Sequence, residues 1–183
     1  VRASLDPGDA RTITIVTDEA YHTYSRPLIS YLLYGKVTEE GMKYRPADFY
    51  KDNCCTLLTG KKVTKIDPKA QRVLLDDGES LPYDKLLVAT GSRPFVPPME
   101  GLDRVKNKFS FMTLDDAKAV KAVIRQDSKV LIVGAGLIGL KAAEGLNGKV
   151  GEIAVVDLAD RVLPSILDET GSSIVRKHIE SKG

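Results

Sequence analysis

Three glycines in the second half of the chain have the spacing of a phosphate-binding turn. Gly134, Gly136 and Gly139 lie in the segment Val-Leu-Ile-Val-Gly-Ala-Gly-Leu-Ile-Gly, between an apolar run typical of a strand and a run with helical periodicity. Such glycines allow a tight turn, let the backbone approach a pyrophosphate and let the helix pack on the strand. The first helical turn, with Leu137 and Ile138, would present its N–H groups to the anion. The sequence therefore predicts a dinucleotide site.

An acidic residue stands where this motif requires one. Asp157 ends an apolar run and follows Gly136 by 21 residues. Its carboxylate is expected to accept hydrogen bonds from the adenosine ribose and to repel a 2′-phosphate, which favours NAD over NADP. Arg161 could instead turn towards such a phosphate, but Asp160 beside it is a competing partner. The alternative is that the glycines serve only a tight strand-to-helix turn.

The residues around this motif predict alternating strands and helices. Thr113 and Asp116 resemble a capping box that opens a helix. The pattern that follows favours a parallel α/β sheet. The expected elements are a helix from 113 to about 125, a strand at 129–133, a helix at 137–146, a strand at 153–157 and a helix at 168–182.

The first half of the chain has a different pattern. A β-branched run at 12–17 predicts a buried strand that ends at Asp18 and Glu19. Turn residues then separate three short strands of an antiparallel meander. The expected elements are the end of a helix and a turn at 1–10, helices at 26–34 and 46–53, meander strands at 63–66, 72–75 and 80–83, and a further strand at 85–89.

The composition of the chain favours a globular protein and argues against a membrane-spanning or nucleic-acid-binding one. The chain has 183 residues, 43% hydrophobic and 28% charged, which is ordinary for a globular protein. A formal charge of +2 does not favour nucleic acid or an acidic membrane, and no apolar run is long enough to span a bilayer. The adjacent Cys54 and Cys55 are expected to be reduced thiols in a strand, without zinc, in a cytoplasmic protein. The first residue, Val1, and the absence of a secretion signal suggest a piece of a longer chain.

Two further motifs resemble those of a known family. The segment Ala89-Thr90-Gly91, followed by Arg93, resembles the Ala-Thr-Gly motif of flavoproteins with two dinucleotide-binding domains, the pyridine nucleotide-disulfide oxidoreductase superfamily. Gly91 precedes Gly134 by 43 residues, which resembles the family's spacing. The segment Tyr-Ser-Arg-Pro-Leu-Ile-Ser around Arg26 is similar to one beside the flavin in rubredoxin, ferredoxin and NAD(P)H nitrite reductases.

The resemblance implies an α/β fold with two Rossmann-like dinucleotide-binding folds, the first incomplete and carrying the β-meander. Residues 1–112 would be part of an FAD-binding domain, and residues 113–183 the first part of an NAD(P)-binding domain. The family's first strand and FAD glycine turn are expected before Val1, and further segments after Gly183. On this interpretation the chain is the middle of a longer flavoprotein.

The resemblance also implies a set of FAD contacts. Asp18 or Glu19 would bind the adenosine ribose, and the backbone of Val63 the adenine. Arg26 could otherwise be a surface helix residue, and Arg93 a solvated turn cation. The remaining implied contacts are Arg26 and Pro27 in the flavin pocket, and Ala89, Thr90, Gly91 and Arg93 along the FAD.

One position departs from the family pattern. Many relatives place a lysine–glutamate pair near the flavin, and Tyr31 and Lys141 appear at the corresponding positions here. Lys141 is then expected to approach the flavin or the nicotinamide, unless it is a solvent-facing lysine on an amphipathic helix. No cysteine lies near the Tyr24–Gly35 segment, so a dithiol mechanism is not expected.

The function implied is hydride transfer from NAD(P)H to FAD and electron delivery to an acceptor. The acceptor would be a rubredoxin-like protein or a metal centre, and a homodimer is a second candidate partner. The cofactors carry the chemistry, so no side-chain acid or base is expected. His22 is expected to pack on aromatic rings rather than to contact a cofactor. The alternatives are a truncated NAD-binding module without catalysis and a methyltransferase that binds S-adenosylmethionine.

Overall fold

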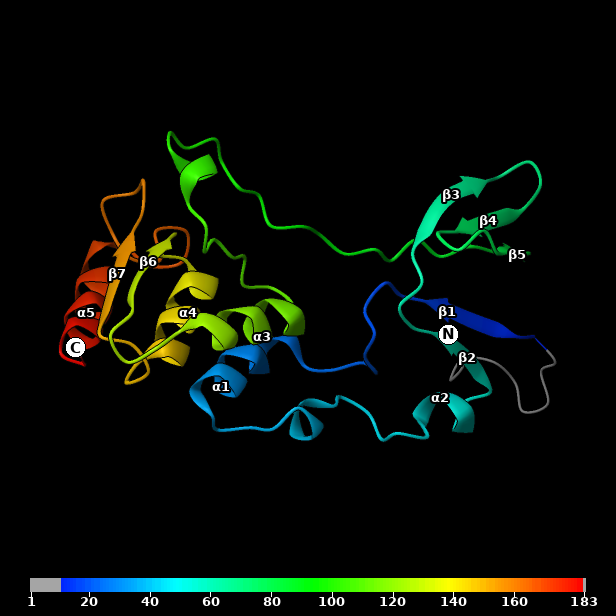
Figure 1. The fold of residues 1–183 in the computed structure, drawn as a ribbon, viewed down its shortest axis with the longest axis horizontal. Coiled ribbons are helices and arrows are strands. Elements are labelled where there is room, and N and C mark those ends of the chain that lie inside the picture. The colour runs from blue at the N-terminus through cyan, green and yellow to red at the C-terminus, as the bar shows by residue number, and fades with distance from the viewer. Residues whose placement is uncertain (1–10, 183) are drawn as a thin grey trace. The chain divides into compact units, whose positions relative to one another are not determined.

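The computed structural model describes residues 11–182, so the helix end and turn expected at residues 1–10 lie outside the described residues. Two compact units are present (Figure 1). One contains residues 11–24 and 43–92, and the other contains residues 25–42 and 93–182. These units are defined by contacts, whereas the expected domains are continuous in sequence. The domain boundary at residues 112 and 113 therefore stays a prediction.

A two-stranded parallel sheet anchors the first unit. Strand β1 (Ile13–Val16) pairs with β2 (Cys55–Leu58), and the short helix α2 (Phe49–Asp52) precedes β2. Beyond the strands the backbone N–H of Lys61 donates to the carbonyl of Thr17, at 3.0 Å. This bond holds the segments after the two strands side by side. Cys54 and Cys55 are free thiols, and Cys55 begins β2. The prediction that both lie in a strand is wrong for Cys54, which is in the turn before β2 with φ +50°.

The predicted meander is confirmed as an antiparallel sheet in the order β3-β4-β5. In its first turn the Asp67 carboxylate accepts hydrogen bonds from the backbone N–H groups of Lys69 and Ala70, at 3.1 and 2.9 Å. Gly78 occupies the second turn with φ +87°, a conformation that favours glycine. The strands are β3 (Val63–Asp67), β4 (Arg72–Leu75) and β5 (Ser80–Pro82).

The prediction of a strand at residues 85–89 is wrong. Leu86, Leu87 and Val88 are 40%, 77% and 61% exposed and belong to no strand. A strand needs a neighbour to complete its hydrogen-bond ladder, and this segment pairs with no strand of residues 11–182. The apolar composition was therefore insufficient to define a strand by itself.

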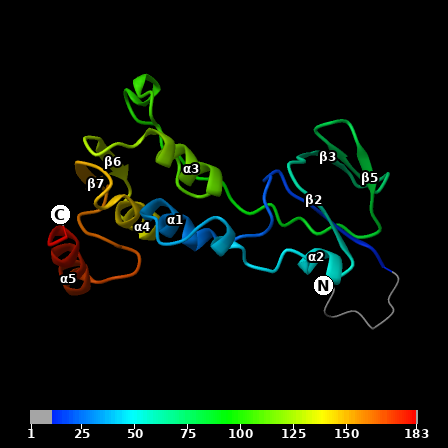
Figure 2. The ribbon, with the colours of Figure 1, turned by 60° about the horizontal axis from the view of Figure 1, so that its bottom comes forward.

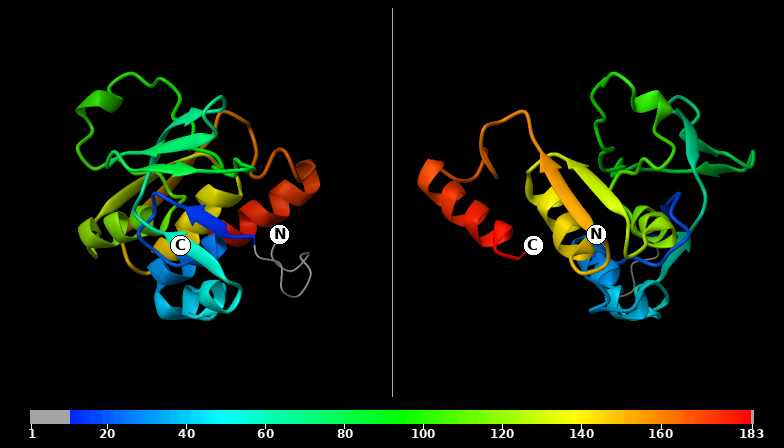
Figure 3. Two further views of the ribbon diagram at one scale, coloured as in Figure 1. Left: turned by 90° about the vertical axis from the view of Figure 1, so that its right-hand side faces the viewer. Right: turned by 60° about the vertical axis from the view of Figure 1, so that its left-hand side comes forward.

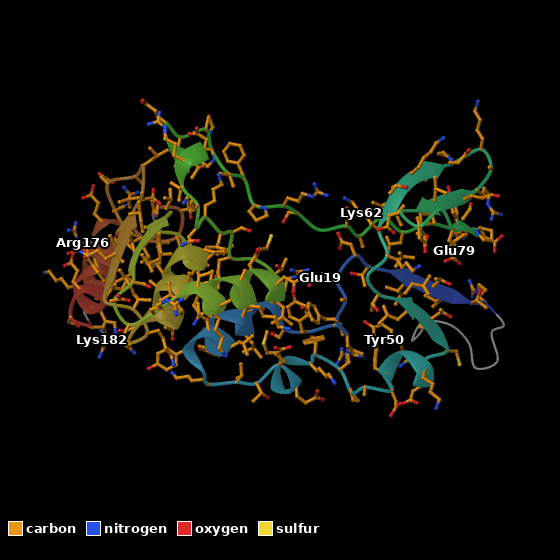
Figure 4. The ribbon with its side chains drawn as sticks, viewed as in Figure 1. Glu19, Tyr50, Lys62, Glu79, Arg176 and Lys182 are labelled. Carbon is orange, nitrogen blue, oxygen red and sulfur yellow. The ribbon has the colours of Figure 1, made fainter. Side chains whose placement is uncertain are left out.

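The second unit contains the predicted strand–helix–strand segment. Strand β6 (Lys129–Val133) pairs in parallel with β7 (Glu152–Val156), and helix α4 (Leu137–Leu146) connects them. Helix α4 packs against both strands (Figure 3). Helix α5 (Glu169–Glu180) follows β7, and Arg176 lies on it (Figure 4). The α/β class expected from the sequence is confirmed.

Three helices build the core of this unit. Helix α1 (Ile29–Tyr34) packs against both α3 (Leu114–Val123) and α4 (Figure 2). A Cβ on Gly145 would lie 2.9 Å from the carbonyl oxygen of Ser30, so glycine lets α1 and α4 approach closely. Residues 11–182 also contain three short 3-10 helices: η2 (Arg26–Leu28), η3 (Glu40–Met42) and η4 (Leu102–Arg104).

The predicted capping box begins α3. The Thr113 hydroxyl accepts from the backbone N–H of Asp116 at 3.1 Å, and the Asp116 carboxylate accepts from the N–H groups of Thr113 and Met112 at 2.9 and 2.8 Å. Partial burial would raise the pKa of Asp116, but these backbone hydrogen bonds outweigh it and leave the pKa below the ordinary value. The carboxylate is thus better stabilised in the folded chain than in the unfolded chain.

We expect Asp116→Asn to reduce the free energy of unfolding by about 1 kcal/mol at pH 7, because weaker hydrogen bonds replace charge-assisted ones. The native contribution is present above the unfolded pKa of about 3.9 and is lost as pH falls through the lower folded pKa. Urea unfolding at pH 7 and at acidic pH should therefore separate the two proteins at pH 7, and the difference should shrink progressively as the pH falls below about 3.9. Asp115→Asn removes the same charge from the same helical turn and is the control; an equal loss in both variants contradicts a capping role.

Candidate dinucleotide-binding site

The glycine turn between β6 and α4 begins with a backbone conformation that requires glycine. Gly134 has φ +113°, where a side chain would be strained. Its N–H donates to the carbonyl of Val156, the last residue of β7, at 2.7 Å. The turn therefore starts at the carboxyl ends of both parallel strands, where open α/β sheets bind ligands.

The other two glycines differ in what surrounds them. A Cβ on Gly139 would lie 1.9 Å from the carbonyl oxygen of Gly134, so the helix rests directly on the turn. A Cβ on Gly136 would meet nothing within 4 Å. Leu137 and Ile138, in the first turn of α4, are 59% and 58% exposed. The start of α4 is therefore open on the side where a pyrophosphate would approach, and the residues present fit that group.

Asp157 lies beside this turn, immediately after β7. Its Oδ2 accepts from the backbone N–H of Ala135 at 2.6 Å, and its Oδ1 accepts from the N–H of Ala159 at 2.8 Å. The N–H donors of Ala159 and Ala135 hold the pKa of the Asp157 carboxyl below its ordinary value. The side chain is thus a carboxylate at neutral pH, and it lies on an exposed residue at the mouth of the turn.

The loop after β7 forms a second wall of this site. The N–H of Leu163 donates to the carbonyl of Ala135 at 3.0 Å, which ties the loop to the glycine turn. Arg161 Nη1 lies 3.4 Å from Asp160 Oδ1, so the expected partnership is present. The Nε atom of Arg161 is buried and has no hydrogen-bond partner among residues 11–182.

Lys141 does not point freely into solvent. It forms an ion pair with Glu144, and its Nζ lies 4.3 Å from the centre of the Tyr31 ring. The hydrogen bond to Glu144 is the main cause that raises the Lys141 pKa. The positions where relatives carry a lysine–glutamate pair thus touch in this chain as a tyrosine and a lysine. The approach of Lys141 to a flavin stays a prediction.

The two acidic residues after β1, Asp18 and Glu19, belong to the first unit, and Glu19 forms hydrogen bonds within it. The Glu19 carbonyl accepts from the N–H of Gly60 at 3.0 Å, and the Glu19 carboxylate accepts a hydrogen bond from the Tyr24 hydroxyl. Asp18 precedes it in the same loop. These positions correspond to a strand end next to a second parallel strand, which is where an adenosine ribose is commonly bound.

His22 packs on an aromatic ring, as expected from the sequence. Its ring centre lies 4.9 Å from that of Tyr50, which belongs to α2 (Figure 4). Its Nε2 atom is buried and has no hydrogen-bond partner among the described residues. A buried polar atom of this kind fits a site that a ligand completes. No local sequence pattern indicates this burial, because it depends on the packing of His22 against Tyr50 of α2.

The other residues predicted to contact FAD lie in several segments. Val63 begins β3 and is 38% exposed, and Gly91 has φ +67° in an extended connector with the exposed Ala89 and Thr90. Within residues 11–24 and 43–92 no glycine-rich turn joins a strand to a helix. The second unit contains Pro27 in η2, the exposed Arg93, and Arg26, whose Nη1 donates to the carbonyl of Met112 at 3.2 Å.

Residues 11–182 contain no group of three or more His, Cys, Asp or Glu side chains that could hold a metal ion. None of the helices in this part of the chain combines the length and apolar character needed to cross a membrane.

A glycine turn after a parallel strand, an open helix start and an acid after the next strand define an α/β dinucleotide-binding domain. Comparison with known proteins specifies the family. Residues 4–183 match the family model described as pyridine nucleotide-disulphide oxidoreductase, and the chain belongs to this family. The resemblance to the pyridine nucleotide-disulfide oxidoreductase superfamily, expected from the sequence motifs, is confirmed.

Three relatives illustrate the match. The chain is 34% identical over 171 residues to the assimilatory nitrate reductase electron transfer subunit of Bacillus subtilis, covering 93% of this chain and 22% of that protein. It is 33% identical to the nitrite reductase [NAD(P)H] of the same organism, covering 96% of this chain and 22% of the relative. The reductase in the covalent putidaredoxin reductase–putidaredoxin complex has a TM-score of 0.85 and 31% identity, covering 100% of this chain and 44% of that one. The chain therefore spans about a fifth of the length of the first two proteins and less than half of the third.

Proposed function

We propose that this chain is the part of a flavoprotein oxidoreductase that binds a nicotinamide coenzyme and the adenosine end of FAD, and that serves hydride transfer between them. The observation that carries the proposal is the turn at Gly134, Gly136 and Gly139 with Asp157 beside it. Residues 1–112 would contribute to the FAD-binding domain and residues 113–183 to the NAD(P)-binding domain. Membership of an oxidoreductase family supports this assignment.

The roles we assign to side chains are binding and orientation. The start of α4 would hold the coenzyme pyrophosphate, with the exposed residues Leu137 and Ile138 supplying N–H groups from the first turn. Asp157 would accept from the ribose hydroxyls of NAD. Asp18 or Glu19 would do the same for FAD. The flavin, when bound, supplies the hydride-accepting chemistry, so no side chain is assigned as an acid or base.

Electrons would pass to a protein or metal-centre acceptor of the rubredoxin or ferredoxin kind. One relative is named as an electron transfer subunit, and a structurally similar reductase is described in a covalent complex with putidaredoxin. These descriptions concern the relatives and support the proposal by similarity. A second copy of the chain remains a candidate partner.

Titration with both coenzymes tests the nucleotide site. We expect NADH to bind the chain at least about tenfold more tightly than NADPH at low salt, because the Asp157 carboxylate accepts from a ribose hydroxyl and repels a 2′-phosphate. Quenching or enhancement of nicotinamide fluorescence gives the two dissociation constants. Tighter binding of NADPH contradicts the assignment of Asp157.

A second measurement separates the oxidoreductase from an NAD-binding module without catalysis. A chain reconstituted with FAD should show a flavin spectrum that NADH bleaches under anaerobic conditions. We expect the FAD to be lost on gel filtration, since no glycine-rich turn for its pyrophosphate is present among residues 11–24 and 43–92. Bleaching supports the oxidoreductase, and a chain that binds NADH without any effect on added FAD supports the binding module.

A further inference from the structure

A single carboxylate joins the two walls of the nucleotide site. Asp157 Oδ2 accepts from Ala135, inside the glycine turn, and Oδ1 accepts from Ala159, in the loop after β7. The two oxygens therefore hold backbone groups from segments more than 20 residues apart in sequence. Binding of the ribose hydroxyls alone does not require the hydrogen bond from Ala135.

Backbone hydrogen bonds hold two other groups of the glycine turn, and the Asp157 carboxylate holds the N–H group of Ala135 at its middle. The N–H of Gly134 bonds to Val156, and the carbonyl of Ala135 accepts from Leu163. The N–H of Ala135, which immediately precedes Gly136, points to the carboxylate. Because a Cβ on Gly136 would meet nothing within 4 Å, packing does not hold that residue, and the Asp157 contact restrains its neighbour.

The carboxylate retains capacity for a ligand after making these bonds. A carboxylate offers about four acceptor sites; the N–H groups of Ala135 and Ala159 use two of them, and the backbone of Leu158 also donates to Asp157, which leaves about one site for a ligand. Among residues 11–182 Asp157 forms no ion pair, and the neighbouring Arg161 pairs with Asp160. The same side chain can therefore fix the turn and accept from a ribose hydroxyl at the same time.

We propose that Asp157 is a positioning residue for the pyrophosphate-binding turn, in addition to its role as the acceptor for the ribose. This inference rests on the proposed nucleotide-binding function. The positioning role predicts an effect that ribose recognition alone does not predict. Loss of Asp157 weakens the binding of ligands that have a pyrophosphate and no ribose hydroxyls.

Electrostatics alone predicts the opposite result. Removing a negative charge beside an anionic pyrophosphate strengthens binding, whereas disordering the turn weakens it. The sign of the change therefore separates the two effects. Asp160→Asn removes a neighbouring charge that does not touch the turn, and it is the matched control.

The experiment compares ADP with 2′,3′-dideoxy-ADP on the full chain by calorimetry. For Asp157→Ala we expect binding of the dideoxy ligand to weaken about tenfold, and binding of ADP to weaken further. Unchanged or tighter binding of the dideoxy ligand by Asp157→Ala overturns the positioning role and leaves the proposed function standing. A wild-type chain that binds neither ligand overturns both.

Hydrogen exchange supplies a readout without ligand. In Asp157→Asn, which keeps the size of the side chain, the Ala135 amide should exchange about tenfold faster than in the wild type, because a neutral acceptor holds it less strongly. The Gly134 amide is bonded to the Val156 carbonyl and should be unchanged. Equal protection of Ala135 in both proteins overturns the inference even if a variant binds ligand poorly for other reasons.

Discussion

The Gly139→Val variant is expected to be the least stable substitution of the glycine turn. Even the first side-chain carbon would lie 1.9 Å from the carbonyl oxygen of Gly134 and 3.3 Å from Ile132 Cγ2. The first of these neighbours is backbone, so no side chain can rotate away to make room. The helix or the turn must shift, and overpacking of this kind costs about 1–3 kcal/mol or more.

Thermal unfolding measures this effect. A loss of about 3 kcal/mol corresponds to a fall in Tm of about 6–12 °C for a chain of this size. Gly101→Val is not a suitable control, because φ at Gly101 is +82° and any side chain is strained there. Gly136→Val is suitable, since that position has open space and φ −80°. A Gly139→Val chain that melts with the wild type contradicts the close packing of α4 on the turn.

Local signals in the sequence predicted the second half of the chain well. The helix expected at 137–146 and the strand expected at 129–133 have the same bounds as α4 and β6. Thr113 and Asp116 form the capping box that their spacing predicts. Each of these features depends on residues a few positions apart, and the sequence contains that information directly.

Features that depend on distant segments were harder to predict. The apolar run at 85–89 predicted a strand, but pairing needs a neighbour that the run itself does not specify. Asp157 was predicted to read a ribose, and its bond to Ala135 was not foreseen, because the two residues are 22 positions apart. The contact between Lys141 and Tyr31 likewise depends on the packing of α1 on α4.

The Gly136→Val variant is expected to show the reverse of Gly139→Val: a nearly unchanged fold and little coenzyme binding. Gly136 has φ −80° and ψ −178°, an extended conformation that valine adopts without strain. A worse N-cap costs about 1 kcal/mol at most. The added side chain occupies the open space at the start of α4, where the backbone must approach the pyrophosphate.

The expected loss of NADH affinity is about a hundredfold or more. Two hydrogen bonds to charged oxygens are each worth about 1.5–3 kcal/mol, and about 1.4 kcal/mol corresponds to a factor of ten in affinity. Fluorescence titration measures the affinity, and Tm measured on the same samples shows whether the fold is intact. Wild-type NADH affinity in a folded Gly136→Val chain is the result that would exclude the start of α4 as the pyrophosphate site. Because Gly139→Val acts through packing, it should reduce Tm and affinity together, and only the open position at Gly136 separates the two.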